Sequence, residues 1–232
     1  MRVHTGLFLA ALMFANGLAA EDKPALTEAE KKDGWVLLFD GTTSTGWKKI
    51  GGKGFPDKGW IIEDGTLHHT AKGGGGDIVT VEPYENFEFY FEWKLAKGAN
   101  SGMKYRVADM PGGAYGPEYQ LLDDDGHSDG KSAKTSTGSL YQIYAPNDKK
   151  KVKPLGEWNS SKVVVNGNHA EHWLNGEKIV EYEFFSDEWK AGVAASKFKG
   201  NAKYGQPAKG YIAFQDHGDE IWLRNIKIKV LK

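Results

Sequence analysis

Strict alternation of apolar and polar residues is the feature of this sequence that most limits its fold. In FEFYFEWKL, residues 87–95, every second side chain is an apolar ring or leucine and its neighbours are mostly charged. Successive side chains of a strand leave opposite faces, so this pattern predicts a strand with one buried face. Similar alternation recurs along most of the chain. We therefore expect an all-β protein, a two-sheet antiparallel β-sandwich with jelly-roll connections.

Turn signals divide the alternating segments into hairpins. The Asp-Gly pair at 64–65 predicts a type I′ turn, and the Asn-Gly pairs at 166–167 and 175–176 predict a three-stranded meander. Residues 27–34 have a capping box and read as a short helix closed by glycine. The region 186–210 has the weakest pattern and is expected to be a long surface loop with one helical turn.

The first twenty residues resemble a secretory signal peptide. Arg2 precedes an apolar run, and small residues occupy positions 17, 19 and 20. The pattern predicts cleavage after Ala19 or Ala20, with Ala19 favoured, and export to the periplasm or the cell exterior. No other apolar run approaches membrane-spanning length. Residues 21–232 are expected to form one soluble β-sandwich domain, large enough to build a core.

Charge and composition limit the partners of this domain. The 30 Lys and Arg residues balance 31 Asp and Glu residues, which predicts no attraction to nucleic acid or to an anionic membrane. There is no cysteine, so the sequence predicts no disulfide, no thiolate metal ligand and no lipid-anchored cysteine. Abundant glycine, with 8 tryptophans, is common in β-proteins that handle sugars. The oligomeric state stays open.

Three strands are each expected to bury one face and to present long hydrogen-bonding side chains on the other. In NSGMKYRV, for example, Met103, Tyr105 and Val107 form the expected apolar face. A plain solvated sheet face is the alternative interpretation. Amides, imidazole, guanidinium and carboxylate together suit hydroxyl-rich ligands, so we expect a shared cavity. Its expected members are Lys104, Arg106, Glu118, Gln120, Gln215 and His217, with Asn100, Tyr141 and Trp158 nearby.

Seven segments, in order, carry a resemblance to a known family: LLFDGTTSTGW, ANSGMKYRV, GPEYQLLDDDG, TGSLYQIYAP, GEWN, HWLNGEKI and GYIAFQDHGDEIWLRNIKI. In these segments the chain resembles the 3-keto-disaccharide hydrolase domain family. The resemblance implies a concanavalin A-like jelly roll and action on glycosides oxidised to a ketone at sugar carbon 3. The matching motifs contain Glu118, Gln120, Asp123, Tyr141, Trp158, Gln215 and His217, and His127 and Asp129 resemble the family's histidine-acid element.

The chemistry of such a substrate defines which groups are needed. A ketone at carbon 3 acidifies the hydrogen at carbon 2, so a base can remove it and the enolate can expel the group at carbon 1; water then adds. Acid-base catalysis of this kind contributes typically ~10²–10⁴ in rate. The candidate bases are Glu118 and His217, the candidate electrophiles Lys104, Arg106 or a metal ion, and the candidate acids Tyr141 and His127. Asn100, Arg106, Gln120, Trp158 and Gln215 are the candidate substrate-binding residues.

The acidic run DDDGHSDG, residues 123–130, has two interpretations. It lacks the spacing of an EF-hand loop. A solvated loop is one interpretation, and a divalent metal site with Asp123, His127 and Asp129 as ligands is the other. This ion is the only cofactor that the residues suggest. His169 and His172 are three apart on a predicted strand, so we expect them on opposite faces and at the surface.

Two other functions compete with the keto-glycoside enzyme. A sandwich glucanase needs a second carboxylate on the strand face of Glu118, but the only residue that shares this face within the strand is Gln120. A non-catalytic carbohydrate-binding module needs only tryptophan stacking and amide hydrogen bonds, and it remains the alternative. A deep pocket with ionisable side chains would favour the keto-glycoside enzyme. A shallow groove lined by aromatic side chains would favour the carbohydrate-binding module.

Overall fold

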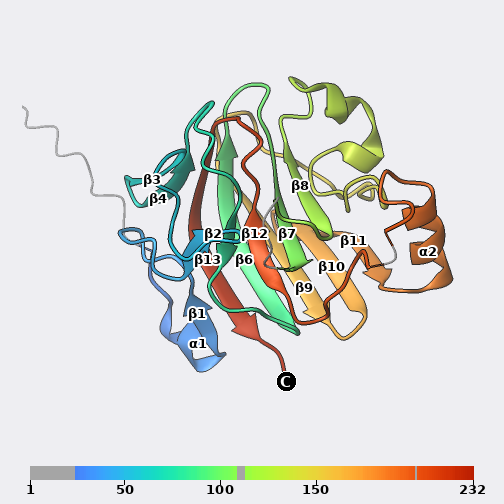
Figure 1. Ribbon diagram of the computed structural model, residues 1–232, viewed down its shortest axis with the longest axis horizontal. Coiled ribbons are helices and arrows are strands. Elements are labelled where there is room, and N and C mark those ends of the chain that lie inside the picture. Colours follow the sequence, from blue (N-terminus) through green and yellow to red (C-terminus); the bar gives the residue numbers. More distant parts are fainter. Residues whose placement is uncertain (1–23, 109–112, 202) are drawn as a thin grey trace, which may run out of the picture.

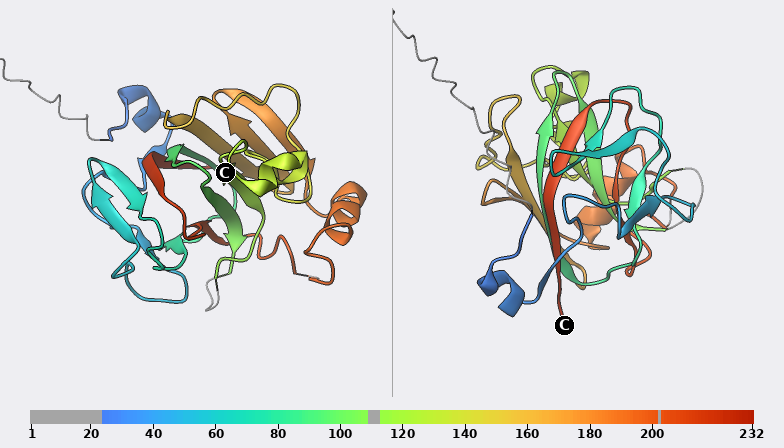
Figure 2. Two further views of the ribbon diagram at one scale, coloured as in Figure 1. Left: turned by 90° about the horizontal axis from the view of Figure 1, so that it is seen from above. Right: turned by 90° about the vertical axis from the view of Figure 1, so that its left-hand side faces the viewer.

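The computed structural model describes residues 24–108, 113–201 and 203–232. Two antiparallel sheets pack face to face (Figures 1 and 2), so the predicted two-sheet sandwich is confirmed. The predicted signal peptide lies outside the described residues. None of the described helices is long and apolar enough to cross a membrane.

The long sheet has eight strands, in the order β11-β10-β9-β6-β13-β4-β3, with β1 also paired to β13. Its strands are β1 (Trp35–Leu37), β3 (Trp60–Glu63), β4 (Thr66–His69), β6 (Phe87–Leu95), β9 (Asn159–Asn166), β10 (His169–Leu174), β11 (Glu177–Glu183) and β13 (Ile221–Val230).

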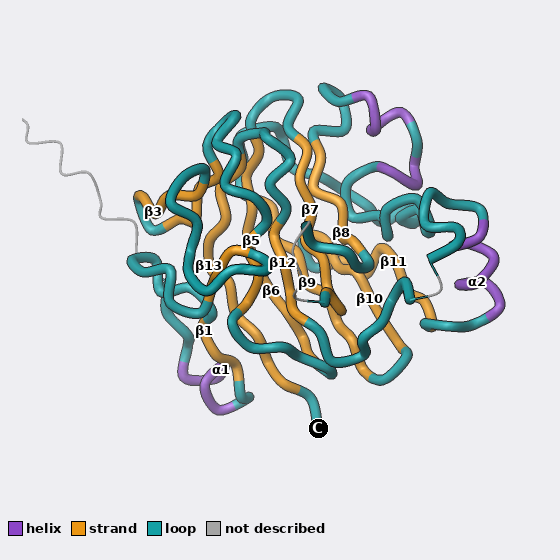
Figure 3. The backbone as a smooth tube through the Cα atoms, viewed as in Figure 1, coloured by secondary structure: helices purple, strands orange, loops and turns teal. Residues whose placement is uncertain are grey.

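The short sheet has five strands, in the order β2-β5-β12-β7-β8. Its strands are β2 (Trp47–Lys49), β5 (Ile78–Thr80), β7 (Asn100–Val107), β8 (Glu118–Leu122) and β12 (Tyr211–Phe214). Figure 3 shows that helices lie only at the periphery of the sandwich. These are α1 (Glu28–Lys32), α2 (Asp187–Ala194) and two 3₁₀ turns, Ser128–Lys131 and Ala133–Thr135.

The aromatic face of β6 forms the centre of the core. Phe87, Phe89, Phe91 and Trp93 are each no more than 2% exposed, as the alternation predicts. The Phe91 ring lies 6.1 Å from the Tyr119 ring of β8 and 5.3 Å from the Phe214 ring of β12, measured between centroids. Aromatic rings of both sheets therefore meet at Phe91, in the edge-on contacts that such pairs prefer.

The helix cap and the turns at 64–65 and 175–176 are confirmed. The turn between β9 and β10 is formed by Gly167 and Asn168, not by Asn166 and Gly167, because Asn166 still pairs with His169. The hairpin of β3 and β4 turns at Asp64 and Gly65, both with positive φ (47° and 73°), as a type I′ turn requires. The meander of β9, β10 and β11 is present, and α1 has its capping box. Helix α2 is longer than the single turn expected, because the Ser186 hydroxyl accepts a hydrogen bond from the Trp189 amide and caps eight residues.

A β-bulge in β7 changes which side chains of this strand face the core, so the predicted alternation is wrong beyond Tyr105. Arg106 has a φ of 52°, and the register with β12 shifts between the pairs Ala213–Lys104 and Tyr211–Val107. An extra residue in one strand of a pair reverses the faces beyond it. Val107 therefore leaves the face of Met103 and Tyr105 and packs in a separate small cluster with Val79 and Ala213.

His172 is a further correction, because it is buried and not at the surface. It is 0% exposed and lies between the sheets. Its Nδ1 donates to the Gly138 carbonyl (3.0 Å), so Nε2 accepts from the Tyr105 hydroxyl (2.8 Å). Burial lowers the pKa of His172 to about 4. His169, on the opposite face of β10 as predicted, lies among glutamates, and hydrogen bonds to Glu183 and Glu171 raise its pKa despite partial burial.

These two histidines predict opposite dependences of stability on pH. The unfolded chain protonates His172 near pH 6.5, but the folded chain does so only near pH 4, so the free energy of unfolding falls as pH is lowered between these values. The loss for this one group is about 3 kcal/mol. Urea titrations across this pH range should show that the free energy of unfolding depends less on pH in His172→Gln than in the parent protein.

His169→Gln is the matched control. Its raised pKa stabilises the folded chain below pH 6.5, and this contribution is lost as pH rises through the folded-state pKa. Removing His169 should therefore steepen the loss of stability towards acid pH, by a small amount because the side chain is partly exposed. Equal slopes in the parent and His172→Gln would contradict the neutral, buried assignment of His172.

Candidate active site

Glu118 is a carboxylate buried on the outer face of the short sheet. The antiparallel register places it opposite Lys104 of β7, with Oε2 3.9 Å from the lysine Nζ. Both side chains are less than a tenth exposed. A Cβ on Gly102 would lie only 2.3 Å from Oε1 of Glu118. Glycine at position 102 therefore provides the space in which the carboxylate lies.

Charges from several elements surround Glu118. Burial raises the pKa of its carboxyl, and the positive charges of Lys104 and Lys197 oppose this rise. In the described part of the chain its carboxylate accepts no hydrogen bond from another side chain or amide. A buried carboxylate without hydrogen-bond donors is a stronger base than a solvated one, because its ionised form lacks compensation.

Two side-chain amides lie on the same face. Gln120 is fully buried beside Asn100, and its Nε2 donates to the Asn100 Oδ1 (3.2 Å). Gln215 follows β12, and its main-chain N–H donates to the Gly102 carbonyl (2.9 Å). Within the described residues, the Oε1 atoms of both glutamines are buried without a hydrogen-bond partner. Two buried acceptors from β8 and the segment after β12 thus lack a donor within the described residues.

The segment of the 3₁₀ turns brings the predicted acids to the site. Tyr141 Oη donates to Asp129 Oδ2 (3.0 Å), and the Asp129 amide donates to Nδ1 of His127 (3.1 Å). The rings of His127 and His217 lie 6.4 Å apart, edge to face. Burial and the bond to Asp129 raise the pKa of Tyr141 to about 12, so its hydroxyl stays protonated. His217 itself is exposed.

Hydrogen bonds from a distant loop support the segment that carries Gln215 and His217. The Asp77 carboxylate accepts from the amides of Ala114 (2.8 Å) and Asp216 (2.9 Å). Asp216 in turn accepts from the Gly76 amide (2.7 Å). These bonds tie three chain segments together behind the site.

Lys197 belongs to the site and was missed by the sequence analysis. It lies on the loop after α2, where its Nζ is 4.3 Å from the centroid of the Tyr141 ring. Its main-chain N–H donates to Gln142 Oε1 (3.0 Å). The region 186–210 carried no periodic pattern, so no signal in the sequence related this lysine to Glu118.

Two of the residues predicted to line the cavity or to lie beside it, Arg106 and Trp158, are not close to Glu118. Beyond the bulge, the Arg106 guanidinium lies 3.7 Å from the Phe184 ring and donates to the Gly205 carbonyl, so it does not share the face of Lys104 as expected. Trp158 lies against Lys94 and Arg224, on the outer face of the long sheet. It is therefore on the far side of the sandwich from Glu118.

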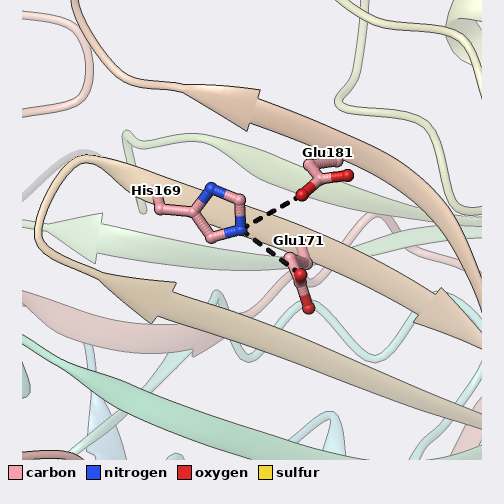
Figure 4. Close-up of side chains that lie close together, drawn as sticks. All are labelled: His169, Glu171 and Glu181. Atoms are coloured by element: carbon pink, nitrogen blue, oxygen red, sulfur yellow. Dashed lines mark hydrogen bonds and ion pairs between the residues drawn. The ribbon is translucent and has the colours of Figure 1, made fainter.

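The acidic run does not gather into a metal-ligand set. Asp123 accepts from the Gly98 amide (2.7 Å), while Asp129 bonds Tyr141. Among the described residues, the one group of three possible ligands within 4.8 Å of one another is His169, Glu171 and Glu181 (Figure 4). Lys178 Nζ already pairs with both of these glutamates, at 3.1 and 2.8 Å. The chain itself therefore already compensates part of the negative charge of this cluster.

Comparisons with known proteins agree with the fold. Residues 34–229 match the family described as the 3-keto-alpha-glucoside-1,2-lyase-like domain. A Bacteroides thetaiotaomicron protein named 3-keto-disaccharide hydrolase is 34% identical, covering 95% of this chain and 87% of its own length.

Two crystal structures of glycosyl hydrolase candidates from Parabacteroides distasonis are similar to the whole sandwich. The first is 40% identical, with a TM-score of 0.82 over 91% of this chain and 100% of that one. The second is 26% identical, with a TM-score of 0.63 over 85% of this chain and 99% of that one.

The electrostatics of the site predict the result of removing its buried lysine. Lys104→Met takes away the nearest positive charge, so the pKa of Glu118 should rise further. Carbon-13 NMR of labelled glutamate carboxyl groups measures this titration directly. The control is Lys94→Met, on the outer face of the long sheet, which should leave the Glu118 titration unchanged. An unchanged Glu118 titration in Lys104→Met would mean that the two groups do not interact.

Proposed function

Because the chain belongs to the family of the 3-keto-alpha-glucoside-1,2-lyase-like domain, we propose that it cleaves 3-keto-glycosides by elimination at carbon 1 followed by hydration. The hydrolase and glycosyl hydrolase relatives support a carbohydrate-processing enzyme with a sugar substrate. The 3-keto requirement and the route through carbon 2 are the proposal. We also propose that the protein acts after export.

The observation that carries this proposal is the buried Glu118 carboxylate. It has a lysine 3.9 Å away, and no hydrogen bond to it is formed by the described residues. Burial raises the pKa of its carboxyl, which makes the ionised form a stronger base than a solvated carboxylate. Of the two candidate bases, Glu118 is favoured over His217, whose side chain is 45% exposed and therefore solvated.

In the proposed reaction Glu118 removes the proton at carbon 2. The electron pair of that C–H bond forms a C2–C3 double bond, and the carbonyl pair moves to the ketone oxygen. When the carbonyl re-forms, a C1–C2 double bond replaces the C1–O bond, and the leaving oxygen takes a proton. Water then adds at carbon 1 and a proton returns to carbon 2, so that the net reaction is hydrolysis.

Tyr141 is the preferred proton donor to the leaving group. Its pKa of about 12 keeps the hydroxyl protonated, and Asp129 orients it at 3.0 Å. An alkoxide leaving group is more basic than a phenolate, so transfer of the proton from Tyr141 to the leaving oxygen is favourable as the C1–O bond breaks. His127, which bonds the Asp129 amide, lies one step further along this chain of contacts.

The binding-module alternative loses its main support in this arrangement. That interpretation depended on Trp158 stacking beside the polar side chains, but Trp158 lies on the other sheet. The glucanase alternative would need a second carboxylate beside Glu118. Asp77 acts on Glu118 only through space and is already bonded to two amides.

Glu118→Gln tests the base. It keeps the shape of the side chain but removes its basicity, so kcat should fall by ~10²-fold or more. The assay follows aglycone release from a 3-keto-glucoside, with the unoxidised glucoside as the substrate that should not react. Glu82→Gln, at an exposed position, should retain the parent rate.

His217→Asn, in the same assay, separates the two candidate bases. A loss in His217→Asn with normal turnover by Glu118→Gln would move the base to the histidine. Near-normal turnover by both variants would overturn this active site. Cleavage of the unoxidised glucoside at an equal rate would overturn the 3-keto requirement.

The pH profile gives a separate prediction. Glu118 must be ionised to act as a base, so kcat/KM should rise with pH through a midpoint above 4.5, the usual pKa of a glutamate. Initial rates between pH 4 and pH 9 measure this midpoint. Lys104→Met should move the midpoint to higher pH, because it removes a charge that favours the carboxylate. A midpoint at or below the usual glutamate value would contradict the assignment.

A further inference from the structure

Two lysines act on Glu118 from different elements and in different surroundings. Lys104, on β7, is 7% exposed and lies 3.9 Å from the carboxylate. Lys197, on the loop after α2, is exposed and pairs with no carboxylate in the described part of the chain. The first lysine already has an anionic partner, and the second does not.

The loop that carries Lys197 is held against the site by several contacts. The Lys197 amide bonds Gln142, and its ammonium lies 4.3 Å from the Tyr141 ring centroid. The next residue, Phe198, is buried and stacks on Tyr204 at 4.2 Å between centroids, and Tyr204 stacks on Trp189 of α2 at 5.7 Å. This exposed ammonium is therefore positioned, unlike that of a lysine on an unanchored loop.

We propose that Lys197 is the electrophile of the site: its ammonium binds the ketone oxygen of the substrate and stabilises the negative charge that develops there. This assignment rests on the proposed 3-keto-glycoside function. In this assignment the two lysines have different roles. Lys104 keeps the buried base ionised, and Lys197 stabilises the enolate that this base generates.

The charge balance of the reaction supports this division. Proton removal by Glu118 neutralises the carboxylate and transfers one negative charge to the ketone oxygen, so negative charge leaves the neighbourhood of Lys104. A second cation is then needed at the oxygen, and interactions that form only as charge develops increase kcat. Cation–π contact with Tyr141 holds the ammonium in place and leaves its N–H donors available for an oxygen.

The other candidate electrophiles are less well placed. The Arg106 guanidinium lies over Phe184 and bonds the Gly205 and Gly167 carbonyls. Asp123 and Asp129 bond an amide and a hydroxyl in separate places. Among the described residues, Lys197 is thus a cation that acts on Glu118, forms no ion pair with a carboxylate and is open to a ligand.

The test compares Lys197→Met, Lys197→Arg and Lys199→Met. Lys199 is an exposed lysine two residues further along the same loop, so it is a matched control for net charge. Loss of one oxyanion donor typically costs ~10²–10³ in kcat, and we expect this for Lys197→Met with little change in KM. Lys197→Arg keeps the charge and should recover activity to within about tenfold of the parent, whereas Lys199→Met should be close to normal.

A carbon-2 deuterated substrate adds a readout that a merely structural role would not move. Without the electrophile, proton abstraction becomes slower relative to later steps, so the isotope effect on kcat should increase in Lys197→Met. The thermal unfolding midpoint of this variant should match that of the parent, because the side chain is exposed.

The outcomes separate the two proposals. A parent protein that cleaves no 3-keto-glycoside overturns the proposed function and this assignment with it. A parent that cleaves the keto-glycoside while Lys197→Met keeps most of its kcat overturns only the assignment of Lys197. An equal loss in Lys199→Met would show that the effect is one of net charge, which also overturns it.

Discussion

Packing of the β6 aromatic face against the short sheet is the contact on which the rest of this structure depends. Phe91 meets Tyr119 and Phe214, so β8 and β12 must each turn those rings inward. Alternation along a strand then places the neighbours of these rings on the opposite face. Glu118 and Gln120 flank Tyr119, and Gln215 follows Phe214. The hydrophobic core thus decides which side of the short sheet carries the polar groups.

The cost of burying a carboxylate is the second constraint, and it is linked to the chemistry. Removing a charged group from water costs several kcal/mol unless it is compensated. At Glu118 compensation is partial: Lys104 lies 3.9 Å away, and Gly102 makes room. Protonation of a carboxylate held in this way is more favourable than protonation of a solvated carboxylate. The incomplete compensation of this charge destabilises the folded chain, and it also makes Glu118 a base strong enough to remove a proton from carbon.

Local pattern was enough to predict much of the site, and its failures have physical reasons. Lys104, Glu118 and Gln120 lie on one face because β7 and β8 pair without irregularity from Asn100 to Lys104. Arg106 departs from this face because of a bulge, which depends on how β7 meets β12 and leaves no periodic trace. Trp158 has the right side chain for a sugar site but adjoins a strand of the other sheet. Strand alternation cannot state which sheet a strand joins.

The sequence by itself determined the strands, most of their turns, the core face of most strands and the side chains that could share a polar face, because these follow from a period of two residues and from turn chemistry. Only the tertiary structure decided which of these faces meet. Lys197 reaches Tyr141 from 56 residues further along the chain through the stacked rings of Phe198, Tyr204 and Trp189. His172 is buried because β10 faces the short sheet. Contacts between distant segments depend on packing in three dimensions, which a local pattern does not encode.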